Sequence, residues 1–186
     1  MLGFLKKANL PNGIQVYCLG TDGEVLSTYH QVEDYFKHGI TVKPGDTIID
    51  IGANIGLFSL AVFERCQRQA HVYAFEPLPK TYKALRRNVS AHGLNMVNAF
   101  QFGVSDEPGS LSFRFYPNTS VSSTAYPNFD LRAQRERLLQ GFENDPVLTK
   151  YRWVKKIPLW LTKPFLNLAV YAINFGYQVT CQVTTV

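Results

Sequence analysis

The stretch that decides the fold is DIGANIGLFSL, residues 50–60. A short apolar run over residues 46–51 leads to two glycines four residues apart, Gly52 and Gly56, after which apolar side chains recur at helical spacing. A glycine directly after a strand permits a tight turn, because it adopts a positive φ without steric penalty. Asn54, between the two glycines, is the next best residue for left-handed backbone. The pattern predicts strand, turn and helix, and we expect unpaired N–H groups at the start of the helix to face a ligand.

Further strands and a further helix follow this unit along the chain. Residues 71–77, HVYAFEP, and residues 96–106, MVNAFQFGVSD, are typical of strands, and residues 79–94 between them form an amphipathic helical pattern. Residues 109–116, GSLSFRFY, alternate as a half-exposed strand does. Strand, helix, strand, helix, strand predicts an α/β, Rossmann-like parallel sheet with right-handed crossovers. Ligands of such sheets lie beyond the carboxyl ends of the strands, where the opening motif falls.

The segments that flank this core carry weaker signals. Residues 10–29 predict a β-rich start with turn signals at residues 12–13 and 21–24, the second of them as the turn of a hairpin, and residues 31–39 predict a short helix. Residues 177–186, YQVTCQVTTV, predict a terminal strand. We therefore expect three segments: an N-terminal β-hairpin and helix cap over 1–39, a Rossmann-like core over 40–116, and a helical basic and aromatic insertion with the terminal strand over 117–186.

Composition narrows the class of protein. The 186 residues are 46% apolar and 18% charged, which is ordinary for one soluble domain. The net charge is +5, but no block of like charges appears, so a nucleic-acid partner is not expected. Cys18, Cys66 and Cys181 lack any metal-ligand spacing and favour reduced thiols, a cytoplasmic protein and no metal site. The apolar run over residues 157–179 is interrupted by charged and polar residues and favours a buried helix or lid over a membrane span.

Three classes of cofactor-binding turn compete for the motif. The dinucleotide fingerprint has a different glycine spacing, and a P-loop needs Lys-Ser or Lys-Thr where Leu57 and Phe58 follow Gly56. In the third class, the S-adenosylmethionine loop, an acid precedes the turn, as Asp50 does. Glu76 follows the second strand about 20 residues after the last glycine, the spacing at which an acid binds ribose hydroxyls in either cofactor. With Asp106, this predicts carboxylates at the ends of three adjacent strands and favours nucleoside binding over three separate caps.

Three ordered blocks resemble the FkbM-type S-adenosylmethionine-dependent methyltransferases. They are HGITVKPGDTIIDIGANIGLFSL at residues 38–60, VYAFEPLPKTYKALRRNV at residues 72–89 and FGVSDEPGSLSF at residues 102–113. Together with the segment that precedes them, the resemblance covers about residues 29–116. It implies a Rossmann-like class I methyltransferase with S-adenosyl-L-methionine as cofactor. It also implies that the acceptor is a hydroxyl group of a natural product, a sugar or a lipid, either as a small molecule or bound to a carrier.

The resemblance also implies which residues bind the cofactor. Those expected around its methionine part and ribose are Asp50, Gly52, Ala53, Asn54 and Gly56. Glu76 is expected to bind the ribose hydroxyls, and Ser105 and Asp106 are expected beside the adenine. The residues themselves suggest His30 as a general base, with an exposed or internally satisfied histidine as the simpler interpretation.

The chain departs from the family pattern after residue 117. The family continues into a fourth strand and an acceptor side, whereas residues 117–186 hold a basic and aromatic insertion. We therefore expect an N-terminal half whose first strand, residues 47–52, becomes a sheet edge. Such an edge is covered by the tail, by dimerisation or by nothing. Basic and aromatic side chains at residues 150–165 suggest contact with an acidic carrier domain or a membrane surface.

Two functions compete with methyl transfer. The first is a non-catalytic binding or interaction module that retains the half-fold. The second is a nicotinamide dehydrogenase, which requires accepting the unusual glycine spacing.

Overall fold

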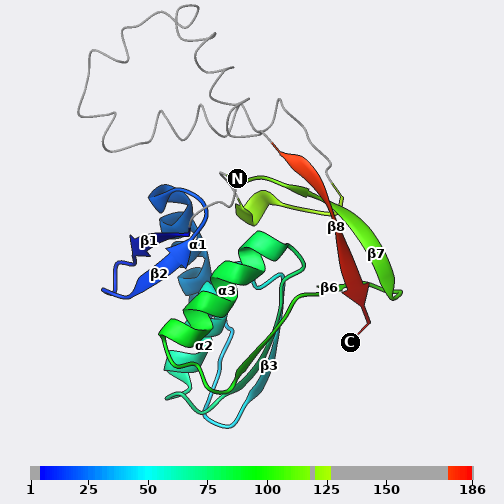
Figure 1. Ribbon diagram of the computed structural model, residues 1–186. Coiled ribbons are helices and arrows are strands. Elements are labelled where there is room, and N and C mark those ends of the chain that lie inside the picture. The colour runs from blue at the N-terminus through cyan, green and yellow to red at the C-terminus, as the bar shows by residue number, and fades with distance from the viewer. Residues whose placement is uncertain (1–4, 118–119, 127–175, 186) are drawn as a thin grey trace, which may run out of the picture. The chain divides into compact units, whose positions relative to one another are not determined.

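The computed structural model describes residues 5–117, 120–126 and 176–185. The chain divides into two compact units, residues 1–125 with 176–186, and residues 126–175. The first unit carries every element named below (Figure 1). The predicted helical insertion, the contact surface at 150–165 and residues 157–175 of the apolar run lie outside the described residues. Residues 177–179, at the end of that run, begin a strand, β8 (Tyr177–Thr184), rather than continue a helix. The division into segments 1–39, 40–116 and 117–186 stays a prediction.

A parallel three-stranded sheet forms the centre of the first unit. Its strands are β3 (Thr47–Ile51), β4 (His71–Phe75) and β5 (Val97–Phe100), in the order β3-β4-β5. Ile48 pairs with Val72, which pairs in turn with Val97 on the other side. The predicted α/β sheet is therefore confirmed for these strands, and the carboxyl ends of β3 and β4 lie side by side.

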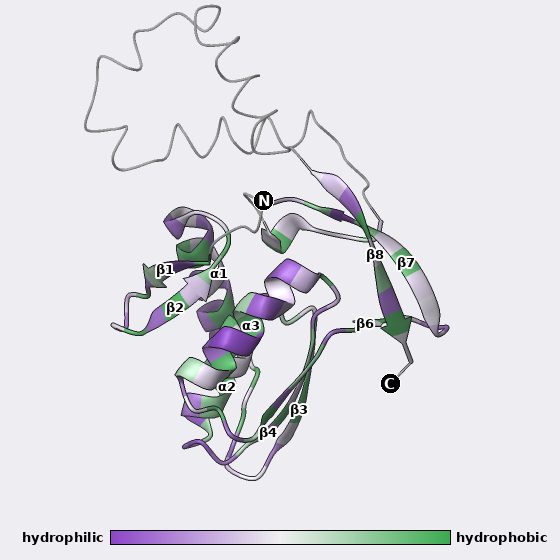
Figure 2. Cartoon of the chain, viewed as in Figure 1, coloured by the Kyte–Doolittle hydropathy of each residue, from purple (hydrophilic) through white to green (hydrophobic). Residues whose placement is uncertain are grey.

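Helices cover one face of this sheet. They are α2 (Leu57–Arg65) and α3 (Pro79–Ala91), which Figure 1 shows on the same side. Most apolar residues of α2 are buried, whereas α3 is amphipathic, and Figure 2 shows its hydrophilic outer surface. Burial of apolar area on this face is the main force that holds the layers together. Val72 and Ala74 of β4 are fully buried beneath the helices.

The opposite face of the sheet is exposed. Ile49 and Ile51 are 50% and 60% exposed, and Tyr73 is 38% exposed. The rings of Phe75 and Phe100 stack on one another at 5.1 Å between centroids. Within the described residues β3 is also an edge strand, as expected from the sequence. The sheet therefore presents an apolar face and an open edge.

The N-terminal region differs from the prediction. β1 (Lys6–Asn9) and β2 (Gln15–Cys18) pair as an antiparallel hairpin around residues 12–13. Residues 21–24 are not the turn of a hairpin but the start of α1 (Asp22–Lys37), where Thr21 Oγ1 accepts a hydrogen bond from the Glu24 N–H. The same residues that favour turns also cap helices, and a Thr before an acidic first turn is such a cap. The predicted helix at 31–39 is the second half of α1.

The C-terminal strands build a second sheet. β6 (Gly103–Val104), β7 (Gly109–Phe115) and β8 (Tyr177–Thr184) are ordered β6-β8-β7, and a short 3₁₀ turn, η1 (Ser120–Ser122), follows β7. The strands predicted at 109–116 and 177–186 are confirmed. The single strand predicted at 96–106 is wrong, because the run divides into β5 and β6, which belong to different sheets. β8 pairs with β6 and β7, so this strand does not cover β3.

The described part of the chain contains no helix long and apolar enough to cross a membrane. It also contains no group of three potential metal ligands, and its three cysteines are free and buried.

Candidate functional site

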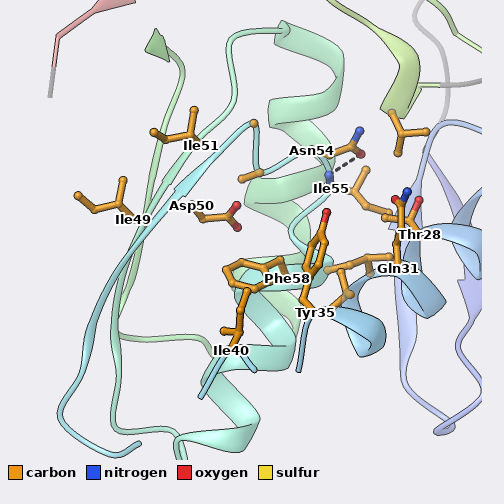
Figure 3. Close-up of a pocket in the computed structure, with 15 residues that line it drawn as sticks. Thr28, Gln31, Tyr35, Ile40, Ile49, Asp50, Ile51, Asn54, Ile55 and Phe58 are labelled. Carbon is orange, nitrogen blue, oxygen red and sulfur yellow. Dashed lines mark hydrogen bonds between the residues drawn. The ribbon is translucent and has the colours of Figure 1, made fainter. Parts of the chain in front are cut away.

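A cavity of about 440 Å³ opens beside the carboxyl end of β3. One wall is β3 with the loop that follows it, and the other is formed by α1 and the first turn of α2 (Figure 3). Its size is that of a small-molecule or cofactor site. The polar residues that line it are Asp50 and Asn54 on the strand and loop side, and Thr28, Gln31 and Tyr35 on α1.

The backbone of the loop between β3 and α2 adopts left-handed conformations at three residues. The φ angles are +74° at Gly52, +51° at Asn54 and +89° at Gly56. Gly56 also has no room for a side chain, because a Cβ there would lie 2.6 Å from Leu85 Cδ1 of α3. Here the glycine permits α2 to begin against α3.

Every N–H group of this loop has an acceptor within the protein. Those of Gly52 and Ala53 both donate to the Phe75 carbonyl at 2.9 Å, and that of Asn54 donates to Glu76 Oε2 at 2.9 Å. The remaining two, at residues 55 and 56, donate to Asn54 Oδ1 at 2.7 Å and to the Ala53 carbonyl at 2.8 Å. The N–H groups of residues 52–56 are therefore not free to bind a ligand. The expected unpaired N–H groups belong to the start of the helix, which lies at Leu57, and they stay a prediction. A loop of this kind does not form the nest of free N–H groups that binds phosphate.

Asp50 is the buried acid in front of the loop. Its side chain points from β3 towards α2, opposite to Ile49 and Ile51 (Figure 3). Ser59 of α2 donates a hydrogen bond to Asp50 Oδ2 at 2.6 Å. Burial raises the pKa of Asp50, against the lowering effect of the bonds from Ser59. Asp50 thus joins β3 to α2 and also lines the cavity.

Glu76 joins the end of β4 to the same loop. It is only 4% exposed, and its two oxygens accept the N–H groups of Asn54, at 2.9 Å, and Leu78, at 3.0 Å. Burial raises the pKa of Glu76 to about 7, against the lowering effect of these bonds, and the nearby charge of Asp50 adds to the rise. The structure therefore gives Glu76 a part in fixing the loop. Its binding of ribose hydroxyls stays a prediction.

Ser105 and Asp106 lie elsewhere in the first unit. They follow β6 rather than β5, and the Ser105 N–H donates to the Thr184 carbonyl of β8 at 3.0 Å. The prediction that Asp106 ends the third strand of the central sheet is therefore wrong, because that strand ends at Phe100 and the chain crosses to the second sheet. Neither residue lines the described cavity, and their place beside an adenine stays a prediction.

His30 is exposed on α1, with its ring edge-on to that of Tyr29 at 5.7 Å. Its neighbour Gln31 lines the cavity, but His30 does not. Its role as a general base stays a prediction to which the geometry of the described cavity adds nothing.

Two residues that hold the loop from outside could hardly be identified from local sequence patterns. Asn88 of α3 donates through Nδ2 to the carbonyls of Ile55, at 2.8 Å, and Tyr17, at 2.9 Å, and accepts the Tyr17 N–H at 2.7 Å. Its only signal was an amide on the buried side of an amphipathic helix. Glu24 of α1 accepts a hydrogen bond from the Ser120 hydroxyl, a partner 96 residues away for which no local pattern exists.

The charged side chains of the described cavity lining are of one sign. Among the described residues that line it there is a carboxylate, Asp50, but no lysine, arginine or histidine. Glu76 lies behind the loop and adds a second buried acid. A positively charged ligand would be attracted by this arrangement, whereas a pyrophosphate would find neither a cationic side chain nor a free N–H group of residues 52–56.

Comparison with known proteins gives a family match and curated relatives. The domain described as "Methyltransferase FkbM domain" matches residues 50–158. The 31-O-demethyl-FK506 methyltransferase FkbM of Streptomyces tacrolimicus is 35% identical over 142 residues, which cover 74% of this chain and 52% of that protein. Methyltransferase 1 of Beauveria bassiana is 40% identical over 84 residues, which cover 45% of this chain and 33% of that protein. The chain thus spans about half or less of the length of these relatives.

Among solved structures, the chain is similar to Pyrococcus horikoshii TYW2 in complex with MeSAdo. The TM-score is 0.44 at 21% identity, and the match covers 58% of this chain and 39% of the other.

Proposed function

Because the chain belongs to the FkbM methyltransferase family, we propose that it binds S-adenosylmethionine in the cavity beside β3 and serves methyl transfer to an acceptor hydroxyl. The observation that carries the proposal is the chemistry of the loop. All five N–H groups of residues 52–56 are bonded within the protein, and the described lining holds an acid but no cationic side chain. This suits a sulfonium compound and disfavours a dinucleotide with its pyrophosphate.

The residues present fit such a cofactor. Asp50 places negative charge beside the loop, and Glu76 fixes the loop from behind. The backbone at Gly52 is open towards the cavity, since nothing lies within 4 Å of a Cβ built there. We infer that Gly52, Ala53 and Asn54 contact the methionine part and the ribose. Gly56 acts through the packing of α2 against α3. The contacts of Glu76 with ribose, and of Ser105 and Asp106 with adenine, belong to this proposal on the strength of the family resemblance.

The chain's own residues would act mainly by binding and orientation. When bound, S-adenosylmethionine supplies an electrophilic methyl group on a positively charged sulfur. Asp50, held by Ser59, fixes a negative charge beside it, while Thr28, Gln31 and Tyr35 of α1 form the facing wall. Correct placement of two reactants can lower a barrier by up to about 7–11 kcal/mol. His30 remains the sequence-based candidate for a base that takes the hydroxyl proton.

The acceptor class rests on the relatives. The Streptomyces protein is named for a substrate that lacks a methyl group on oxygen, which supports a hydroxyl acceptor on a natural product, sugar or lipid, free or bound to a carrier. The chain spans 52% of that protein, and we infer from the cavity beside β3 that the described residues supply the cofactor side of the site.

Calorimetric titration with S-adenosylhomocysteine and with NAD tests the proposal. We expect the first compound to bind and the second not to bind. Asp50→Asn should weaken binding of S-adenosylmethionine about tenfold, because it removes the charge that attracts the sulfonium and keeps the shape, and should weaken S-adenosylhomocysteine, whose sulfur is neutral, less. Asp46→Asn is the matched control, since Asp46 caps the turn at the opposite end of β3 through the Lys43 N–H and should leave affinity unchanged. Binding of NAD alone would contradict the proposal and favour a dehydrogenase.

A second candidate is a binding module without catalysis of its own. The exposed edge of β3, with Ile49 and Ile51 half or more exposed, favours it, because this wall of the cavity is open. A second copy of the chain is one way to cover such an edge. Binding of S-adenosylhomocysteine without methyl transfer from labelled S-adenosylmethionine to hydroxyl acceptors would support this candidate, and sedimentation would show whether a dimer forms.

A further inference from the structure

A second, much smaller cavity of about 10 Å³ lies next to the first. The two share the lining residues Thr28, Asn54, Ile55 and Val121, and the small one adds Glu24 and Ser120. A space of this size accommodates one water molecule or one amino group, provided that polar partners are present.

Glu24 presents a buried carboxylate oxygen with no partner. Its other oxygen, Oε1, accepts the Ser120 hydroxyl at 3.0 Å and the Val121 N–H at 3.1 Å, so the side chain is held in place. Oε2 is buried, and nothing in the described part of the chain donates to it. A buried acceptor without a donor is costly and is uncommon in native structures.

The carboxylate of Glu24 is tied to the cofactor loop. Ser120 Oγ also contacts the side-chain amide of Asn54 at 3.4 Å, and the Asn54 N–H is bonded to Glu76. A group that reaches Oε2 from the main cavity would therefore pass directly beside Asn54. Burial raises the pKa of Glu24, and a cation at Oε2 would offset this effect.

We propose that Glu24 is a further cofactor-binding residue, whose Oε2 accepts a hydrogen bond from the α-ammonium group of the cofactor's amino-acid part. The inference rests on the proposed function, because it takes S-adenosylmethionine as the ligand of the main cavity. An ammonium group is small enough for the space, donates hydrogen bonds and carries the charge that a carboxylate attracts. Ser120 is then a positioning residue that sets the direction of the carboxylate.

The test compares two ligands in calorimetric titrations of the full chain. S-adenosylhomocysteine carries the ammonium group, whereas 5′-methylthioadenosine lacks the whole amino-acid part. Glu24→Gln keeps the shape but places an amide N–H₂ or a neutral oxygen at the position of Oε2. We expect it to weaken S-adenosylhomocysteine about 10- to 100-fold, as for the loss of a charged hydrogen bond, and to leave 5′-methylthioadenosine unchanged.

Glu33→Gln is the matched control. Glu33 is on the same helix and pairs with Arg65 at 2.7 Å, so its loss should affect neither ligand. Unchanged 5′-methylthioadenosine binding also shows that the Glu24→Gln variant has folded. If this variant fails to fold, Ser120→Ala replaces it, with a several-fold loss expected for S-adenosylhomocysteine alone.

Two results would overturn the inference while the proposed function stands. An equal loss for both ligands would mean that Glu24 only supports the loop, and no loss for either would mean that a water molecule occupies the small cavity. If the unaltered chain bound neither ligand, the proposed function itself would fail, and the inference with it.

Discussion

Glu76 and Asp106 are both acids that follow strand-like runs, yet the structure places them in opposite environments. Glu76 is 4% exposed and accepts the N–H of Asn54, which is 22 residues away. Asp106 is exposed and accepts from its neighbours Ser105 and Glu107, and the hydrogen bond from Ser105 is the main reason that its pKa lies below its usual value. The first acid joins two elements of the fold, whereas the second orders only its own turn. Hydrogen-bond partners that are distant in the sequence, rather than the local sequence pattern, distinguish an acid of the candidate site from an acid of a surface loop.

The largest effect on stability is expected from a substitution at Gly56, where α2 begins against α3. Gly56→Ala combines a left-handed backbone with a Cβ 2.6 Å from Leu85 Cδ1, and should lower the free energy of unfolding by about 3 kcal/mol. Gly45→Ala is the control, because Gly45 has a similar φ of +91° but nothing within 4 Å. It should cost about 1 kcal/mol. Equal losses in urea unfolding would show that α2 and α3 do not need this glycine for their packing.

Substitution of Glu76 and substitution of Asp106 should change the stability of the protein by different amounts. Glu76→Ala leaves the N–H groups of Asn54 and Leu78 without their acceptor, and should lower the free energy of unfolding by about 2–3 kcal/mol. Asp106→Ala should have no measurable effect on the urea midpoint. Similar losses of stability in the two variants would show that Glu76 does not join β4 to the loop more strongly than Asp106 orders its own turn.

The pH dependence of stability sharpens the same contrast. The folded protein keeps the proton of Glu76 up to about pH 7, whereas an unfolded chain releases it near the ordinary value, so stability is fully present at low pH and is lost as the pH rises through 7. The loss between pH 5 and 7.5 should be about 2 kcal/mol. Glu76→Gln should remove most of this slope, and Asp106→Asn should leave it intact. A flat profile for the unaltered protein would contradict the burial of Glu76.

The smallest effect concerns the partner of Asp50. Ser59→Ala removes the hydrogen bond of 2.6 Å to Oδ2 and should cost about 1–2 kcal/mol in urea unfolding at pH 7. Because Asp50 takes up a proton at lower pH, the cost should shrink as the pH falls. Ser90→Ala, at an exposed position of α3, provides the comparison and should be neutral.

The central elements could be predicted because their signals are local. The apolar run of β3, the two glycines and the helical spacing of α2 are each local signals in the sequence, and the structure confirms the elements they predict. The start of α1 at residues 21–24 was missed, because Thr, Asp and Gly favour turns and helix caps alike.

The second sheet and the hydrogen bonds around the loop depend on contacts that no local pattern encodes. The division of residues 96–106 between two sheets requires β8, which supplies Val183 as the partner of Gly103 from much further along the chain. The internal bonding of the loop N–H groups requires the Phe75 carbonyl and Glu76 at the end of β4. Glu24 and Ser120 meet across 96 residues. In each case the second partner becomes apparent only when the chain has folded.

Chemical-shift mapping tests the central claim most directly, by following the backbone amides of labelled protein during titration with S-adenosylhomocysteine. The account predicts the largest changes at Gly52, Ala53 and Asn54, with changes at Thr28 and Gln31 on the facing wall. Binding that left these amides unchanged, or no binding at all, would contradict the assignment of the cofactor to the cavity beside β3.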